Sequence, residues 1–351
     1  MNFYTHIMKP SVDLSARVMS FWKMKAGFLL TAVLAVVLAT TGTIAQAGQY
    51  PEKAITVVVG YSAGGGTDTY ARVLASVIPE YINMQPLIIV NKAGGAQIPS
   101  MKFTANSKPD GYTLQFFSGG SGVVATMLRD KGIDFFDDFV PIAQVGITNK
   151  TLVAHKNSGY KTPQDIIAAA KKANAEGKKL RWAHPGRGTI DNLAVIAWLI
   201  KNDIYDMVQD VPFKGGSPTR AALLGEQVDF GAMGLQKLQG FEDKLNQIGH
   251  FSPVPDPVNK DAVSLKDMDS PHVQVYSPMI MAAPKGTPQE VIDTMAAAIK
   301  KATEHKAFQK LTKKAGLGVV FKGPKETQEL MEKLRDEWQP TIDFVKQRMA
   351  K

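Results

Sequence analysis

The residues from Gly60 to Asp68 read GYSAGGGTD, and the first five of them match the GxSxG pattern that surrounds the nucleophile of many serine hydrolases. An apolar run, Ile55 to Val59, precedes this stretch, and a helical pattern of apolar residues follows it. A strand, a tight turn and a helix are what a catalytic Ser62 needs. They equally suit an anion-binding loop, because such a turn aims the unpaired N–H groups of a helix N-terminus at a negative ligand.

Three glycine-rich stretches lie where a predicted strand gives way to a predicted helix. They are residues 63–68, 185–189 and 213–217. Ligands of open α/β sheets bind at the carboxyl ends of the strands, which is where such loops lie. Each stretch alone indicates only a tight turn. The three together predict one shared cleft.

The serine hydrolase hypothesis requires a histidine and an acid later in the chain, and oxyanion donors from an earlier loop. Ile55 to Val59 is the first strand after the N-terminal segment, so no earlier strand supplies that loop. The later histidines lie at strand ends, beside an irregular stretch or in a polar helical pattern: His155, His250, His272 and His305. We therefore expect no catalytic residue and interpret Ser62 as a hydroxyl donor to a ligand or as a turn residue. A secreted hydrolase that uses Ser62 is the alternative.

The N-terminal segment has the three parts of a secretory signal in order. Lys23 and Lys25 precede the apolar stretch 26–39, and Ala45-Gln46-Ala47 has the small residues of a cleavage site. We expect residues 1–47 to be removed, with extra residues ahead of a true start at Met19. The sequence thus predicts an exported protein that is soluble in the periplasm, since no other stretch approaches the roughly 20 apolar residues of a spanning helix.

Composition excludes several classes of function. The 351 residues are 44% hydrophobic and 21% charged, which is enough for about two globular domains. The net charge is +9, but the lysines are spread over helical faces without interleaved aromatic residues, so no nucleic-acid partner is expected. The absence of cysteine excludes disulfides and thiolate chemistry. His184 has no neighbouring cluster of ligating residues, and we expect no metal and no cofactor.

Short apolar runs alternate with helical patterns after Gln49, which predicts an α/β fold with mixed, mostly parallel sheets flanked by helices. Helices are predicted over 70–81, after the start signal Thr162-Pro163, and near Pro288, Ala307 and Pro324. A loop between two bodies of structure is predicted over 251–271. The predicted strands are 55–59, 87–90, 112–117, 142–147, 152–155, 180–183, 228–232 and 273–283.

The chain resembles the periplasmic solute receptors of tripartite tricarboxylate transporters, the Bug-type binding proteins. The resemblance runs from Tyr50 almost to the C-terminus, through GYSAGGGTDTYARVLA, IIVNKAGGAQIPS, KPDGYTL, VPFKGGSPTRAALLGEQVDF and AAPKGTPQEVI. It implies a two-domain type II periplasmic-binding-protein fold with the ligand in the interdomain cleft. We place domain 1 at 48–148 plus 271–351 and domain 2 at 149–270, with crossings near 147–151 and in the 251–271 loop.

The resemblance also implies a function. Such a receptor captures a small organic anion, a carboxylate, and delivers it to the permease subunits of a tripartite tricarboxylate transporter without covalent chemistry. We expect a monomer whose domains close on the ligand. The same binding activity also suits a sensory input to a signalling kinase, and the sequence does not separate these roles. Aromatic acids, dicarboxylates, tricarboxylates and amino acids all stay open as ligands.

Matching loop positions imply a set of ligand-binding residues. Capping of the following helix explains Asp68 without a ligand, and Lys214 either neutralises a carboxylate or supports its loop. With the second-domain loop that contains Arg187 added, the predicted set is Tyr61, Ser62, Gly64, Gly65, Gly66, Asp68, Ser118, Gly119, Arg187, Gly188, Thr189, Phe213, Lys214 and Gly215.

The chain departs from the family pattern at four places, which leaves its ligand open. It lacks the family's FPPGG at 61–65, its SSGNGS at 184–189, its Asp-Asn pair near Met233-Gly234 and its aromatic residue near Pro278-Met279. Arg187 belongs to the second of these departures. A guanidinium between two glycines can bind a carboxylate or sulfonate through two parallel hydrogen bonds. The alternative is an exposed arginine in a flexible loop.

Overall fold

The strand that precedes the first glycine loop lies inside a parallel group of three. The computed structural model describes residues 50–128, 132–253 and 255–349. In it β1 (Ile55–Val59) pairs with β2 (Leu87–Asn91) on one side and β3 (Thr113–Ser118) on the other, both in parallel. The other strands are β4 (Phe139–His155), β5 (Leu180–His184), β6 (Val208–Pro212), β7 (Phe230–Gly234), β8 (Leu245–His250), β9 (Tyr276–Pro284) and β10 (Gly318–Lys322).

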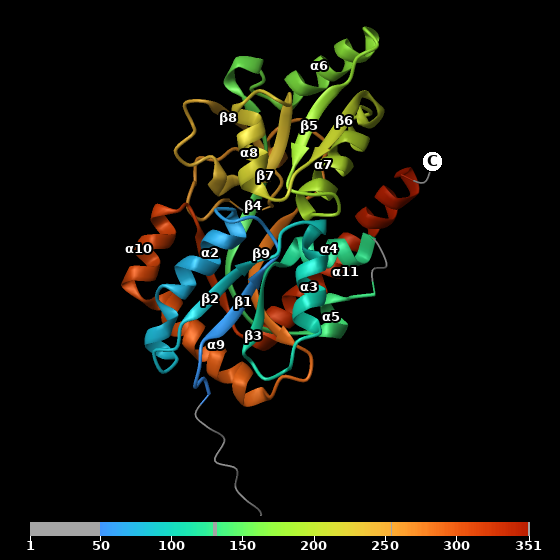
Figure 1. Ribbon diagram of the computed structural model, residues 1–351. Coiled ribbons are helices and arrows are strands. Elements are labelled where there is room, and N and C mark those ends of the chain that lie inside the picture. The colour runs from blue at the N-terminus through green and yellow to red at the C-terminus, as the bar shows by residue number, and fades with distance from the viewer. Residues whose placement is uncertain (1–49, 129–131, 254, 350–351) are drawn as a thin grey trace, which may run out of the picture. The chain divides into compact units, whose positions relative to one another are not determined.

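One strand, β4, belongs to two sheets. It is continuous over 17 residues, so the two strands predicted at 142–147 and 152–155 are a single element. Its first part, as far as Asn149, pairs with β9 and β10, and β9 also pairs with β3. From Lys150 onward its partners are β7 and β8. Figure 1 shows β4 passing from the sheet that contains β1 and β3 to the sheet that contains β5 and β7.

The second sheet repeats the pattern of the first. β5 lies between β6 and β7 in parallel, whereas β7 and β8 are antiparallel to β4. Both sheets are therefore mixed, with parallel pairing in the glycine-loop halves and antiparallel pairing around β4. The sequence reading did not find β6, β8 and β10, because these short strands contain exposed or polar residues such as Gln209, Asp210 and Asn246.

Helices flank both sheets, as the alternating sequence pattern predicted (Figure 1). Local signals fix several of their ends: Thr162 caps one helix and forms a reciprocal capping box with Asp165. The helices are α2 (Gly66–Ala75), α3 (Ile98–Ala105), α4 (Gly119–Leu128), α5 (Phe135–Asp138), α6 (Pro163–Ala175), α7 (Ile190–Lys201), α8 (Gly216–Leu224), α9 (Gln289–Glu304), α10 (Lys306–Lys314) and α11 (Pro324–Met349). Short 3₁₀ segments lie at Ile78–Tyr81, Gly95–Gln97, Lys156–Ser158, Tyr205–Met207, Leu235–Lys237 and Leu265–Asp267.

Helix α7 is buried from Ile190 to Leu199 and is held by large side chains. Trp198 of α7 packs edge-on against Phe230 of β7, which stacks on Trp182 of β5. The Trp198 indole also donates to the Ser270 hydroxyl at 2.8 Å, so its one polar atom is satisfied. This packing holds α7 against the second sheet.

The predicted signal segment 1–47 and the predicted start at Met19 lie outside the described residues. The domain division at 48–148 plus 271–351 and 149–270 stays a prediction, with the partner change of β4 at 149–150 as its nearest structural landmark. Among the residues that the structure describes, no helix has both the length and the apolar character needed to cross a membrane.

The hydroxyl of Tyr70 ties α2 to the strands at the partner change. It is fully buried and lies 2.9 Å from the carbonyl oxygens of both Ile147 and Gly318. We expect Tyr70→Phe to lower the free energy of unfolding by about 1–2 kcal/mol, because two buried carbonyl groups lose a donor. Urea-induced unfolding measures this. Tyr112→Phe is the control, since the Tyr112 hydroxyl accepts only an exposed hydrogen bond from Glu52; equal losses in both variants would contradict the prediction.

Candidate functional site

The carboxylate of Asp68 holds the first glycine loop in shape. It accepts hydrogen bonds from the Gly64 N–H (2.8 Å), the Asn91 amide (2.8 Å) and the Arg72 guanidinium (2.9 Å). Burial by itself raises the pKa of a carboxyl, but these donors outweigh burial and hold the pKa of Asp68 below its ordinary value. The carboxylate is thus occupied by partners from its own loop, its own helix and β2, and the N-cap of α2 has no side-chain hydrogen bond.

The first loop is bonded to the FKGG loop and to the residues that follow β7. The Ser62 N–H and hydroxyl both donate to the Lys214 carbonyl oxygen, at 3.2 and 2.9 Å. The Gly64 carbonyl oxygen accepts from the Ser217 hydroxyl at 2.7 Å and from the Lys237 ammonium at 2.6 Å. The loops at the strand ends of the two sheets are therefore in direct contact, and the cleft between them is closed.

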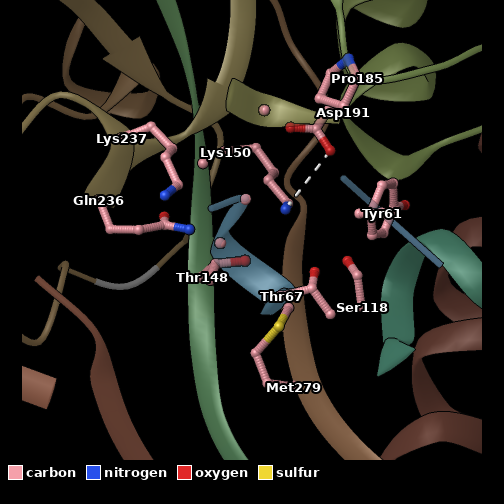
Figure 2. Close-up of a pocket in the computed structure, with 14 residues that line it drawn as sticks. Tyr61, Thr67, Ser118, Thr148, Lys150, Pro185, Asp191, Gln236, Lys237 and Met279 are labelled. Atoms are coloured by element: carbon pink, nitrogen blue, oxygen red, sulfur yellow. Dashed lines mark ion pairs between the residues drawn. The ribbon is translucent and has the colours of Figure 1, made fainter. Parts of the chain in front are cut away.

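A small cavity lies beneath these contacts. Its free space is about 30 Å³, which is room for only a few water molecules. It is lined by Tyr61, Gly65, Gly66, Thr67, Ser118, Thr148, Lys150, Pro185, Asp191, Gly216, Gly234, Gln236, Lys237 and Met279, which Figure 2 shows as sticks. Four of the sequence-predicted residues are in this set: Tyr61, Gly65, Gly66 and Ser118.

Three charged side chains face this cavity. The Lys150 ammonium of β4 lies 3.5 Å from the Asp191 carboxylate in the first turn of α7, and both side chains are less than a tenth exposed. Lys237 follows β7 and is also buried; burial, with Arg220 nearby, lowers its pKa to about 8, although Asp68 acts in the opposite direction. Figure 2 shows Lys237 and Gln236 on one side of Lys150, with Asp191 and Tyr61 on the other.

Neutral donors and helix ends complete the lining. Burial raises the pKa of the Tyr61 hydroxyl above its ordinary value, so this group stays a neutral phenol at physiological pH. The Ser118 hydroxyl lies 2.8 Å from that of Ser277, and the Thr148 hydroxyl has no hydrogen-bond partner among the described residues. The N-termini of α2 and α8 reach the cavity at Gly65, Gly66 and Gly216. Their first N–H groups have no acceptor within the helix.

One glycine is needed where the loops of the two sheets meet. Gly215 has φ +136°, a value that other residues rarely adopt, and it lies against Tyr61 and Ser62. A Cβ on Gly66 would lie 2.1 Å from the Gln236 amide nitrogen, but that atom ends a flexible side chain that can move aside.

The structure places Arg187 away from this cavity. Its guanidinium donates two hydrogen bonds to the Asp210 carboxylate, at 2.7 and 3.1 Å, and is more than half exposed. It lines a separate hollow of about 620 Å³ between α7 and β6. His184, on the other side of Asp210 at 3.3 Å, and the Arg187 pair hold the pKa of Asp210 well below its usual range. Arg187 thus has a protein partner in this closed form.

The remaining sequence-predicted residues support the loops. Ser62, Gly64 and Lys214 form the contacts between loops, and the Lys214 side chain is exposed. Gly119 packs against Ile280, where a Cβ would lie 2.8 Å from its side chain. The Gly188 N–H donates to the Asn192 side chain, and Thr189 caps α7. The Phe213 N–H donates to the His184 carbonyl oxygen, and Gly215 lies against Tyr61 and Ser62.

The sequence reading missed the charged residues of the cavity. Lys150 lies inside the predicted crossing at 147–151, where no ligand-binding residue was predicted. Asp191 is absent from the predicted ligand-binding set, although it lies next to Thr189 and Ile190 in the sequence. All four family departures contain a residue that lines the cavity: Tyr61, Pro185, Gly234 and Met279.

Comparison with known proteins places the chain among solute receptors. The family described as "Tripartite tricarboxylate transporter family receptor" matches residues 70–347. A UPF0065 protein from the gbd 5′ region of Cupriavidus necator is 31% identical over 286 residues, which cover 79% of this chain and 82% of that protein.

Solved structures show the same two-domain fold. MatC from Rhodopseudomonas palustris, solved with bound malate, is 24% identical with a TM-score of 0.76, over 84% of this chain and 100% of that one. The periplasmic binding protein BugD is 23% identical with a TM-score of 0.76, over 84% and 98% of the two chains. The expected fold class is thereby confirmed. The chain belongs to the family of tripartite tricarboxylate transporter receptors.

Proposed function

We propose that this protein is a periplasmic receptor that captures a small organic anion in the cavity between its two sheets and delivers it to the permease subunits of a tripartite tricarboxylate transporter. The observation that carries the proposal is a small cavity at the ends of both sheets that is lined by two buried lysine side chains and the N-termini of two helices. Malate in the MatC structure supports a carboxylate as the ligand class. We further propose that the receptor works as a monomer.

The electrostatics of the cavity favour an anion. The lowered pKa of Lys237 means that the buried site disfavours its positive charge. A carboxylate beside this ammonium relieves the cost, and charge-assisted hydrogen bonds are among the strongest that proteins form. Helix N-termini at Gly66 and Gly216 add partial positive charge from the backbone.

Ligand entry requires the two lobes, each formed by one sheet and its helices, to separate. A free space of about 30 Å³ is too small for a dicarboxylate, and hydrogen bonds of Ser62, Ser217 and Lys237 hold the loops beside it together. Opening about β4 and the 251–271 loop breaks these few hydrogen bonds and exposes both lysines. A ligand that bridges the lobes then shifts the population toward the closed form.

We also propose that the protein does no covalent chemistry at Ser62. The Ser62 hydroxyl donates to the Lys214 carbonyl, with no histidine among its hydrogen-bond partners in the described residues. Its backbone does not have positive φ, unlike the strained turn of a nucleophile elbow. Helix α2 begins four residues later, at Gly66, and not directly after the serine.

A carboxylate library in a thermal-shift assay tests the receptor function. A ligand present at a hundred times its dissociation constant should stabilise the protein by about 2.7 kcal/mol. We expect stabilisation by at least one small carboxylate among malate, succinate, citrate, benzoate and glutamate. Stabilisation only by neutral or cationic solutes would contradict the proposed ligand class.

The best carboxylate then serves to locate the site. Lys237→Met should weaken its binding about tenfold to a hundredfold in calorimetric titration, because a buried anion loses a charged donor. Arg187→Ala should change the dissociation constant less than about threefold, since Asp210 already binds that guanidinium outside the cavity. Lys301→Met, at an exposed position on α9, controls for net charge. The reverse order of effects would move the ligand to the Arg187 loop.

Labelling with a fluorophosphonate probe tests the hydrolase alternative. We expect no modification of Ser62, because no base lies beside its hydroxyl. Intact-mass spectrometry of wild type and Ser62→Ala gives the result, with a known serine hydrolase as positive control. Stoichiometric labelling of the wild type that disappears in Ser62→Ala would replace the receptor with an enzyme.

A further inference from the structure

A buried carboxylate is unexpected in a cavity that binds anions. Asp191 projects from the first turn of α7 into the cavity, and its side chain is only 4% exposed. One of its oxygens, Oδ2, lies 3.5 Å from the Lys150 ammonium. The other, Oδ1, is buried and has no hydrogen-bond partner among the described residues. A carboxylate in this position repels a simple anion unless it serves some part of the ligand.

The pair with Lys150 leaves hydrogen-bonding capacity unused on both sides. Charge-assisted hydrogen bonds between nitrogen and oxygen are ordinarily about 2.7–2.9 Å long, so 3.5 Å is an ion pair without a well-formed hydrogen bond. An ammonium has three donors and a carboxylate about four acceptor sites. Lys150 therefore has donors to spare, and Asp191 has acceptors to spare, at neighbouring points on the cavity wall.

A ligand that complements this wall carries the opposite charges side by side. We propose that the protein selects a small zwitterion with an ammonium next to a carboxylate, the arrangement found in α-amino acids, in which the ligand ammonium binds Asp191 and the ligand carboxylate binds Lys150. This inference rests on the proposed function, because it concerns the same cavity. The alternative is that Asp191 only neutralises Lys150.

Further polar side chains line the rest of the cavity and suit the remaining part of such a ligand. Lys237 and Gln236 lie on the far side of Lys150 from Asp191, as Figure 2 shows. They suit a second anionic or polar group. Tyr61, on the same side of Lys150 as Asp191, stays neutral and adds no charge to the cavity wall. The cavity therefore has a cation-binding side and an anion-binding side.

Matched ligand pairs test the selection. The probes are L-aspartate with succinate, L-glutamate with glutarate, and L-alanine with propionate, each pair differing by the ammonium. In calorimetric titration of the wild type, we expect the amino member of at least one pair to bind more than about tenfold more tightly, since a site built for a hydrogen-bonding group rejects an analogue that lacks it. Asp191→Asn should remove this preference while succinate-type ligands keep or gain affinity. Asp261→Asn, an exposed change of the same kind, should leave the preference intact.

The outcomes separate this inference from the receptor function. Carboxylate binding with no preference for amino members, or a preference that survives in Asp191→Asn, overturns the zwitterion inference and leaves the receptor intact. Failure of every carboxylate to bind overturns both. If Asp191→Asn does not fold by thermal melting, Lys150→Gln replaces it: it should weaken both members of a pair and keep the amino preference, and loss of that preference would overturn the inference.

Discussion

The structure depends on one strand that has to serve two sheets. β4 pairs with β9 and β10 up to Asn149 and with β7 and β8 from Lys150. Alternate residues of a strand share a face, so Thr148 and Lys150 point to the same side at the partner change. That side is the floor of the cavity. A buried lysine at this point needs a countercharge, either from a neighbouring side chain such as Asp191 or from a ligand.

The contacts that close the lobes are mostly made by backbone carbonyl groups. Lys214 and Gly64 contribute their oxygens, and the donors are Ser62, Ser217 and Lys237. Carbonyl acceptors of this kind do not identify a ligand. The loops therefore set when the cleft is closed, whereas the side chains beneath them, from β4, α7 and the end of β7, set what the cleft accepts. In this division Ser62 belongs to the loops, because its hydroxyl donates to the Lys214 carbonyl oxygen.

Much of the fold could be predicted from the sequence because its signals are local. The run Ile55 to Val59 and the start signal at Thr162-Pro163 specify a strand and a helix without reference to the rest of the chain. The clustering of glycine loops followed from a general rule of α/β sheets, and Tyr61 and Ser118 do line the cavity.

The charged centre could not be predicted in that way. Lys150 meets Asp191 only because the register of β4 and the packing of Trp198 bring together residues 41 positions apart in the sequence. In the sequence, Lys150 lies in a predicted connection, and Asp191 is a polar residue in a largely apolar helical pattern. Arg187 shows the same limit, since its chemistry suits an anion, but the sequence did not reveal that Asp210, on β6, is its partner.

The Lys150–Asp191 pair explains how a lysine can be buried at this point. A lone buried ammonium carries a large desolvation cost. Asp191 lies on the same side of the cleft as Lys150, because α7 packs on the sheet that β4 joins from Lys150 onward, so the countercharge is present whether the cleft is open or closed. The pair also affects which ligand binds. A plain carboxylate must compete with Asp191 for Lys150, whereas a ligand with its own ammonium leaves neither residue unpaired. Discrimination in this cleft thus arises from repulsion of the wrong ligand as much as from attraction of the right one.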